Sequence, residues 1–313
     1  MRTRWCALLM ALMGLPTVAL GAGPMAPGEV VVAGYLPDYR AASFDPEALR
    51  GLTDLLVFSA EPTATGPLNL SRVKAMPWAR LRAYKTRARV RLWLSVGGWE
   101  RSGQFATVTA SAEKRKAFVE SAVRVCLEHR LDGLDLDWEH PQTRAEQDGY
   151  AALLADLRRG FEPHGLMLSL TMAGWQQLPR AAFAAVDRIH LMAYDQEGRH
   201  ATFEGARKEV ELIKAAGAPV GKLVLGMPFY GRGVEQRSRT LTYAEIVEKF
   251  KPKPEVDEVE GVYFNGPALI RRKTTYAVEQ GLAGVMVWEL GQDARGARSL
   301  LGVVRETLEK QRR

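Results

Sequence analysis

The sequence predicts an α/β fold, a single closed (β/α)8 TIM barrel with a reduced insertion after its seventh strand. Eight short apolar runs alternate with longer segments, several of which have a helical pattern. The runs are rich in Val, Leu and Ile and are bounded by Gly or Pro, which is typical of buried strands. Alternating strands and helices imply a parallel sheet, and eight such units over about 290 residues fit a closed barrel.

The elements follow in order along the chain. The expected strands are 30–36, 54–60, 90–98, 132–139, 166–173, 187–195, 222–231 and 281–290. Helical patterns lie between them, for example at 112–130 and 205–217. The longest connection, 232–280, has room for a helix, a small hairpin and the barrel helix. We find no interdomain linker or tandem repeat, so one domain is expected over 28–313.

The N-terminus has the layout of a secretory signal peptide, which we assign to residues 1–22. An early pair of arginines precedes an apolar run over 5–20, and small residues follow, with cleavage expected after Gly21 or Ala22. The alternative is a membrane anchor, but the run is short and is interrupted by a glycine and a proline. We therefore expect a secreted or periplasmic protein with no membrane association after signal removal.

Composition narrows the class of partner. The chain is 47% apolar and 25% charged, which excludes a disordered protein, and its formal net charge of +7 is spread over dispersed basic residues without an aromatic stripe for nucleic acid. Cys6 leaves with the signal, and Cys126 lies alone in a helical pattern, where a buried hydrophobic role is expected. The five histidines show no metal-ligand spacing. We expect a monomer with no metal and no other cofactor.

The segment LDGLDLDWEHP, at 131–141, concentrates acidic residues on a strand that otherwise reads as buried. Alternate residues of a strand share a face, so Asp135, Asp137 and Glu139 point one way and the apolar residues between them point the other. In a barrel the apolar face packs on the helices, which leaves the carboxylates inside. Glu139 comes last, at the strand end where barrel active sites lie. Asp132 has the opposite parity, although a bulge at Gly133 could re-aim it.

Carboxylates stacked about 7 Å apart inside a barrel cannot all ionise without help. Coupling of this kind raises at least one pKa, as a general acid requires near neutral pH. A solvent-facing strand would carry Lys or Arg, which this one lacks, and a calcium loop would need a Gly that is absent. Structural carboxylates paired with distant Arg or Lys remain an open alternative.

These residues resemble the signature D-G-x-D-x-D-x-E of glycoside hydrolase family 18, the chitinase-like family. LSVGGW, LMAYD, LGMPFYGR and GVMVWELGQD are similar to the family's third, sixth, seventh and eighth strands, and these motifs begin at 94, 191, 225 and 284. The resemblance extends from about residue 30 to 305. It implies no attacking carboxylate: the substrate's own 2-acetamido oxygen forms an oxazolinium ion, and the anomeric configuration is retained.

The resemblance also implies a role for each catalytic residue. Glu139 would protonate the glycosidic oxygen. Asp137 would orient the acetamido group and help to cycle the proton on Glu139, while Asp135 would share a proton with Asp137. Tyr194 and Asp195 would hydrogen-bond the acetamido group.

Apolar and aromatic residues near the predicted strand ends would line the substrate site, because aromatic faces stack on sugar rings. Those expected to bind substrate, together with Asp195, are Tyr35, Phe58, Met192, Met227, Phe229 and Trp288. By resemblance Trp288 lies beneath the reactive sugar. Barrel packing is the alternative for each of these six. Trp99 and Trp175 are either exposed platforms or loop anchors.

The sequence departs from the family pattern in ways that predict a shallow, open groove. His140 stands where Tyr is common, the loop after Asp195 is very short, the insertion over 232–280 is reduced, and no separate chitin-binding module is found. The implied partner is a polysaccharide or oligosaccharide that contains N-acetylglucosamine.

The function implied by the resemblance is hydrolysis of β-1,4-linked N-acetylglucosamine glycans, chitin or chitooligosaccharides. Two alternatives remain: the same chemistry on peptidoglycan or the chitobiose core of N-glycans, and a non-catalytic chitin-binding lectin. Lectins of this family usually lack the terminal Glu, whereas Glu139 is present.

Overall fold

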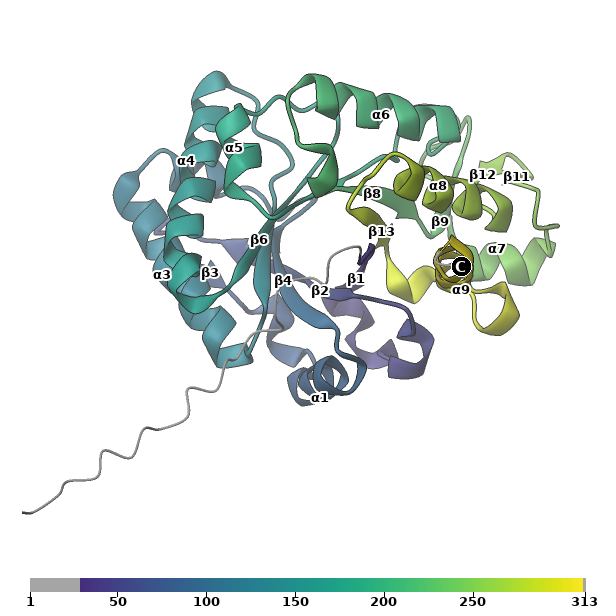
Figure 1. Cartoon of the computed structure of the whole chain (residues 1–313), viewed down its shortest axis with the longest axis horizontal. Coiled ribbons are helices and arrows are strands. Elements are labelled where there is room, and N and C mark those ends of the chain that lie inside the picture. Colours follow the sequence, from purple (N-terminus) through teal and green to yellow (C-terminus); the bar gives the residue numbers. More distant parts are fainter. Residues whose placement is uncertain (1–28, 312–313) are drawn as a thin grey trace, which may run out of the picture.

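A computed structural model of the chain describes residues 29–311. Within that range eight parallel strands close into a barrel, in the order β1-β13-β8-β7-β6-β5-β4-β2 with β2 pairing back to β1 (Figure 1). This confirms the predicted fold class. The barrel strands are β1 (Val31–Pro37), β2 (Asp54–Pro62), β4 (Arg91–Gly97), β5 (Gly133–Asp137), β6 (Met167–Met172), β7 (Arg188–Leu191), β8 (Leu223–Pro228) and β13 (Gly284–Trp288). The two-residue β3 (Leu68–Asn69) pairs antiparallel with β2.

Helices surround the barrel, and several begin at a residue whose side chain caps them. Thr143 starts α4 with a reciprocal capping box to Glu146, and Ser111 and Thr202 cap α3 and α6. The helices among the described residues are α1 (Trp78–Ala88), α2 (Phe105–Thr109), α3 (Ala112–His129), α4 (Arg144–Phe161), α5 (Arg180–Ala185), α6 (Phe203–Ala215), α7 (Tyr243–Phe250), α8 (Pro267–Glu279) and α9 (Leu300–Gln311). Short 3-10 turns lie at Asp38–Ser43, Pro46–Leu49, Arg72–Ala75, Glu162–His164, Val220–Lys222, Leu290–Gln292 and Gly296–Arg298.

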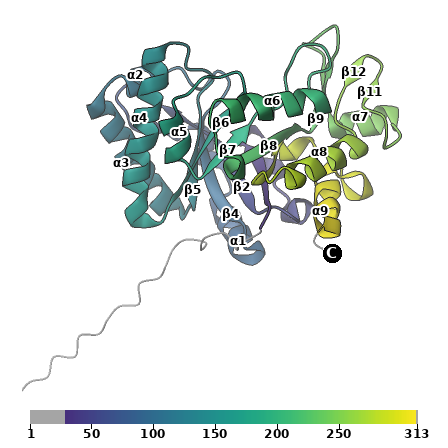
Figure 2. The same ribbon diagram turned by 45° about the horizontal axis from the view of Figure 1, so that its top comes forward.

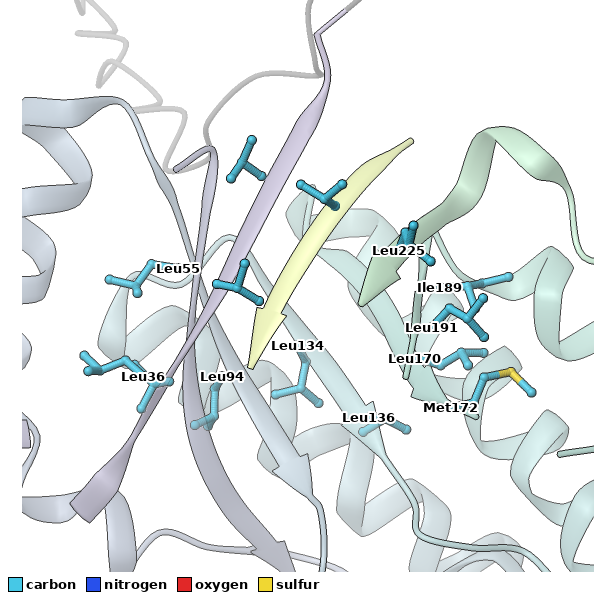
Figure 3. Packing of buried hydrophobic residues seen from close by; sticks show 14 of the residues in the cluster. Leu36, Leu55, Leu94, Leu134, Leu136, Leu170, Met172, Ile189, Leu191 and Leu225 are labelled. Carbon is cyan, nitrogen blue, oxygen red and sulfur yellow. The ribbon is translucent and has the colours of Figure 1, made fainter. Parts of the chain in front are cut away.

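Strand parity separates the main core from the barrel interior. Outward-facing residues pack against the helices in one large apolar cluster, and Figure 3 shows members of it on neighbouring strands, among them Leu134, Leu136 and Leu170. The inward-facing residues of the same strands form a smaller cluster with a different composition: aromatic residues such as Tyr35 and Trp93 lie there together with buried polar groups. The period-2 pattern of the acidic strand is therefore confirmed, with Asp135 and Asp137 inside.

The chain after the seventh barrel strand differs from the expectation. The predicted strand 222–231 divides at Phe229, and the chain continues as β9 (Tyr230–Gly233) in a separate antiparallel sheet. This sheet has the order β10-β9-β12-β11, from β10 (Thr240–Thr242), β11 (Glu258–Val259) and β12 (Val262–Tyr263). The expected helix and hairpin exist as α7 and β11–β12, but the hairpin is half of a four-stranded sheet. Figure 2 shows this insertion gathered at one side of the barrel.

Asp132 is a structural carboxylate, so the expectation that a bulge at Gly133 could re-aim it is wrong. The β4–β5 and β5–β6 registers run without interruption through Gly133. The Asp132 carboxylate accepts hydrogen bonds at 2.8 Å from Lys85 Nζ and from the Leu92 backbone N–H. The alternative of a carboxylate paired with a distant Lys therefore holds for this member of the acidic segment.

Two further expectations concern the cysteines and the N-terminus. Cys126 is fully buried in α3 as a free thiol, as predicted. The signal peptide at 1–22, which includes Cys6, lies outside the described residues. Of the helices in residues 29–311, none has both the length and the apolar character needed to cross a bilayer.

Gly133 provides a test of how tightly the barrel interior is filled. A Cβ at this position would lie 2.5 Å from both the Met167 carbonyl oxygen and the Trp93 ring. We expect Gly133→Ala to lower the free energy of unfolding by about 1–3 kcal/mol, because neither neighbour can move without disturbing the strands. Urea unfolding measures this. The matched control is Gly221→Ala, where the new methyl group meets no atom within 4 Å and the change should stay within about 0.5 kcal/mol.

Candidate active site

A cleft of about 740 Å³ opens at the carboxyl ends of the barrel strands. The structure brings most of the predicted site residues to this cleft or to the layer beneath it. Those that line it are Tyr35, Phe58, Asp137, Glu139, Met192, Tyr194, Asp195 and Trp288. Asp135 lies two residues before Asp137 on the same face of β5 and is fully buried in the barrel interior. Residues more than 250 positions apart in the sequence thus form one surface.

Hydroxyl groups surround the Asp135 carboxylate. Tyr35 from β1 donates at 2.9 Å, and Ser95 from β4 donates at 3.0 Å. Two residues of β6 complete the set, Ser169 at 2.6 Å and Thr171 at 3.1 Å. These four donors replace water around a buried charge, and hydrogen bonds to an ionised acceptor are stronger than neutral ones.

Asp137 lies above Asp135, and its environment favours the protonated form. Burial raises the pKa of Asp137 well above its usual value, and the charges of Glu139 and Asp135 raise it further. Among the described residues its Oδ1 atom has no hydrogen-bond partner, in contrast to Asp135. The direction of this shift favours the protonated form of Asp137, which can donate one hydrogen bond and accept others.

Glu139 lies two residues beyond the end of β5, in the lining of the cleft. Burial raises the pKa of Glu139 to about 7, the negative charge of Asp195 adds to this shift, and a hydrogen bond from the Trp99 backbone opposes it. A carboxyl group with this pKa exists in both protonation states near neutral pH, which suits a group that both donates and accepts a proton.

His140 contacts the Glu139 carboxylate without forming an ion pair. Its Nε2 lies 3.6 Å from Glu139 Oε2, but burial lowers the pKa of His140, so the ring is neutral near pH 7. The ring meets Trp175 at 4.8 Å between centroids in an edge-on arrangement. His140 therefore packs the loop after β5 against Trp175 rather than adding charge beside Glu139.

Hydrogen-bond donors and a positive charge hold Asp195 as an anion. Burial alone would raise the pKa of Asp195, but His200, Tyr230 and Arg232 lower it below its usual value. The Tyr230 hydroxyl donates at 2.6 Å, Arg232 donates at 3.0 Å, and His200 Nδ1 lies 3.4 Å away. Tyr230 and Arg232 belong to β9, so the insertion after the seventh strand completes this part of the site.

Aromatic rings form the floor and the rim of the cleft. Trp288 contacts Phe58 at 4.7 Å and Tyr35 at 5.4 Å between ring centroids. At the rim the side chains of Trp99 and Trp175 are 69% and 59% exposed. The sequence left these two as platforms or loop anchors, and their exposure within the cleft lining favours platforms.

The structure does not bring Met227 and Phe229 to the cleft. Both are fully buried in the large apolar cluster between strands and helices. Met227 has the outward parity of β8, because its neighbour Gly226 faces the interior beside Tyr194. Their expected contact with substrate is therefore replaced by barrel packing, the alternative that the sequence left open.

Sequence reasoning also missed cleft residues that no motif marks. Tyr39 follows β1 and is 60% exposed at the rim. Arg101 lies over the Phe58 ring at 4.9 Å and donates to Asp38 at 2.9 Å, and Arg237 donates to the Asp195 carbonyl at 2.8 Å. These are loop residues whose positions depend on contacts distant in sequence.

The profile of the family "Glycosyl hydrolases family 18" matches residues 42–293, which is most of the chain. The chain belongs to this family. The match confirms the resemblance of the acidic strand and its companion motifs.

Individual relatives agree with the family assignment. "Chitinase 1" of Aphanocladium album is 28% identical over 291 residues, covering 72% of this chain and 67% of its own length. "Probable chitinase 2" of Drosophila melanogaster is 25% identical, covering 64% of this chain and 55% of its own length. The chain thus spans between about half and two thirds of the length of these two relatives.

Solved structures share the fold over nearly the whole chain. The family 18 chitinase ChiB of Flavobacterium johnsoniae has a TM-score of 0.79 and 28% identity, with 90% of this chain and 95% of that chain covered. A chitinase of Cycas revoluta, in complex with (GlcNAc)4, has a TM-score of 0.77 at 22% identity and supports the fold alone.

The raised pKa of Glu139 predicts a dependence of stability on pH. A carboxyl group whose pKa rises to about 7 on folding favours the folded state below its unfolded pKa, and this contribution is lost as pH rises through 7. Glu139→Gln cannot ionise, so at pH 8 we expect it to be more stable than the wild type by about 1–3 kcal/mol, with the difference vanishing near pH 4. Unfolding by urea across this range measures it.

The control for that comparison is Glu279→Gln, at the exposed end of α8. Its difference from the wild type should not depend on pH in the same way. Parallel stability curves for Glu139→Gln and the wild type between pH 4 and 8 would contradict the raised pKa.

Proposed function

We propose that this protein is a retaining glycosidase that hydrolyses β-1,4-linked N-acetylglucosamine glycans, chitin or chitooligosaccharides, by substrate-assisted catalysis through an oxazolinium intermediate. One observation carries the proposal. Glu139, with a pKa of about 7, lies two residues beyond the end of β5, which carries Asp137 with its raised pKa and Asp135 surrounded by hydroxyls, and all three lie near the aromatic floor at Trp288.

The first step breaks the bond between the anomeric carbon and the glycosidic oxygen. Glu139 gives its proton to that oxygen, which leaves with the bonding electron pair as the hydroxyl of the departing sugar. The acetamido carbonyl oxygen of the remaining sugar forms a bond to the anomeric carbon and yields the oxazolinium ion. Asp137 keeps its proton and donates a hydrogen bond to the newly ionised Glu139, while its other oxygen accepts from the acetamido N–H.

In the second step water attacks the anomeric carbon and reopens the ring. Glu139 takes one proton from this water and returns to its starting state, and the acetamido group regains its neutral form. Two inversions at the same carbon give net retention, so the first product is the β-anomer.

The neighbouring carboxyl groups favour the internal nucleophile. The raised pKa of Asp137 favours its protonated form, which is a poor nucleophile. The Asp195 carboxylate already accepts hydrogen bonds from Tyr230 and Arg232, which makes it a weaker nucleophile. These observations support the acetamido oxygen of the substrate as the nucleophile, and we assign Tyr194 and Asp195 to bind the acetamido group.

The substrate class follows from the same step, since the sugar must carry a 2-acetamido group. Chitin and its oligomers meet this requirement, as do peptidoglycan and the chitobiose core of N-glycans. We prefer chitin because the two relatives described above are named chitinases and because exposed indoles at the rim suit repeated flat sugar rings. We further propose export by the signal peptide at 1–22 and action as a monomer.

The deciding experiment incubates the protein with chitopentaose and analyses early products by mass spectrometry and NMR. Release of β-anomeric chitobiose or chitotriose would support substrate, retention and bond position together. If chitopentaose is not cleaved by folded protein, the substrate assignment is wrong, and peptidoglycan and N-glycan substrates are assayed next.

Glu139→Gln separates an enzyme from a lectin on this fold. The amide keeps the shape but has no proton to donate, so kcat should fall by about 10²–10⁴-fold while chitopentaose still binds. Initial rates and calorimetric titration measure the two quantities, with Glu279→Gln as the control for loss of one surface carboxylate. Hydrolysis at the wild-type rate by Glu139→Gln would exclude the role assigned to Glu139.

Trp175 should contribute binding energy without taking part in bond cleavage. We expect Trp175→Ala to weaken chitopentaose binding about fivefold, which corresponds to about 1 kcal/mol for one lost stacking contact. Calorimetry in the Glu139→Gln background measures this without turnover. Leu212→Ala, which removes an exposed apolar side chain on α6 away from the cleft, should leave binding unchanged.

A further inference from the structure

A buried histidine lies in the barrel interior beneath the catalytic carboxylates, and the mechanism above does not use it. His190 faces inward from β7 and is 1% exposed. Its Nδ1 atom lies 2.8 Å from the Tyr35 hydroxyl and 3.6 Å from Asp135 Oδ1. The Tyr35 and His190 rings meet edge-on at 5.9 Å between centroids. His190 therefore contacts the group that holds Asp135 rather than the cleft itself.

The Tyr35 hydroxyl has one hydrogen and three polar neighbours. Asp135 Oδ2 lies 2.9 Å away, Thr171 Oγ1 lies 2.7 Å away, and His190 Nδ1 lies 2.8 Å away. If Nδ1 carried a lone pair, it would compete with the carboxylate for that hydrogen. If Nδ1 carries a hydrogen, it donates to the Tyr35 oxygen, and the Tyr35 hydrogen is free to serve Asp135.

Thr171 strengthens this choice. Its hydroxyl lies 3.1 Å from both oxygens of Asp135. Whether Tyr35 donates to the carboxylate directly or to Thr171, the last hydrogen of the chain reaches Asp135. With a hydrogen on His190 Nδ1, every hydrogen bond in this group is donated toward Asp135.

The other ring nitrogen of His190 identifies the tautomer. Among the described residues Nε2 has no hydrogen-bond partner. A buried N–H without an acceptor is costly and rare, whereas a buried acceptor without a donor is tolerated more often. The hydrogen of a neutral ring therefore belongs on Nδ1, where the Tyr35 oxygen can accept it.

The charges around His190 keep the ring neutral. Burial has the largest effect and lowers the pKa of His190, and Arg188 on the same strand lowers it further. Asp135 on β5 and Asp54 on β2 act in the opposite direction, and Tyr35 on β1 faces the ring as a neutral phenol with a pKa well above its usual value. The contact with Asp135 at 3.6 Å thus joins a neutral imidazole to a carboxylate.

We propose that His190 is a positioning residue: as the neutral tautomer with hydrogen on Nδ1, it donates to Tyr35 and directs the Tyr35 hydrogen to Asp135. Asp135 then remains ionised, and the single proton of the Asp135–Asp137 pair resides on Asp137, where it can form a hydrogen bond to Glu139. The tautomer of His190 and its hydrogen bond to Tyr35 do not depend on the proposed function, whereas the effect on catalytic rate rests on it.

Two substitutions distinguish hydrogen-bond donation from space filling. His190→Leu removes the donor, and His190→Asn keeps an N–H at the same end of the side chain. In His190→Leu we expect kcat to fall about tenfold and the acid limb of the kcat–pH profile to move up by about 0.5–1 unit, because a less stabilised Asp135 competes for the proton. KM should not change, since His190 does not line the cleft.

His190→Asn should restore kcat to within about twofold of the wild type and return the acid limb to its position. A pH profile of His190→Leu that superimposes on that of the wild type would overturn the proposal. An acid limb equally displaced in both variants would also overturn it, because the donor would then be irrelevant.

An NMR measurement on the wild type tests the structural part without any turnover. In the histidine 15N spectrum, assigned by the signal missing from His190→Asn, we expect a hydrogen on Nδ1 and a bare Nε2 at neutral pH. A hydrogen on Nε2, or a doubly protonated ring, would overturn the proposal even if His190→Leu failed to fold. Absence of hydrolysis by the wild type would instead refute the proposed function and leave this result standing.

Discussion

The site depends on one buried charge, the carboxylate of Asp135 at the centre of the barrel. An ion in this position loses its water, and only directed hydrogen bonds can replace that solvation. Hydroxyls from β1, β4 and β6 do so, which requires β4 and β6 to be in register with β5 and β1 to face Asp135 across the barrel. The charge of Asp135 is also one of the causes that raise the pKa of Asp137, which lies directly above it.

The carboxyl groups of the cleft divide into two classes according to their neighbours. Asp137 and Glu139 lie above another carboxylate in a buried environment, and both have raised pKa values. Asp195 is also partly buried, yet its neighbours are Arg232, Tyr230 and His200, and its pKa is lowered. The negative charge of Asp195 is also one of the causes of the shift in Glu139. Acid and anion are thus set by their surroundings rather than by residue type.

The small insertion has a direct part in this arrangement. The sheet formed by β9 to β12 is reduced, but β9 begins two residues after the seventh barrel strand ends and carries Tyr230 and Arg232 to Asp195. A further residue from the same insertion, Arg237, holds the Asp195 carbonyl. The insertion is small, but its hydrogen bonds and charges hold Asp195 in the wall of the cleft.

Local periodicity allowed much of the fold to be predicted. The alternation of apolar and acidic residues at 131–141 placed Asp135 and Asp137 inside the barrel, because strand parity is a property of adjacent residues. The eight strands were identified for the same reason, with errors of a few residues at their ends. The role assigned to each carboxyl group came from the family motif, since parity alone does not distinguish an acid from a structural anion.

The sequence by itself determined the barrel, the inward face of the acidic strand and the position of Glu139 at its carboxyl end. Only the tertiary structure showed that Asp132 pairs with Lys85, that Met227 faces the helices, and that the rings of Trp99 and Trp175 are exposed at the cleft. The hydrogen bond between His190 and Tyr35 joins residues 155 positions apart. Partners of this kind are chosen by the closure of the barrel, which brings distant strands together and leaves no trace in the local pattern.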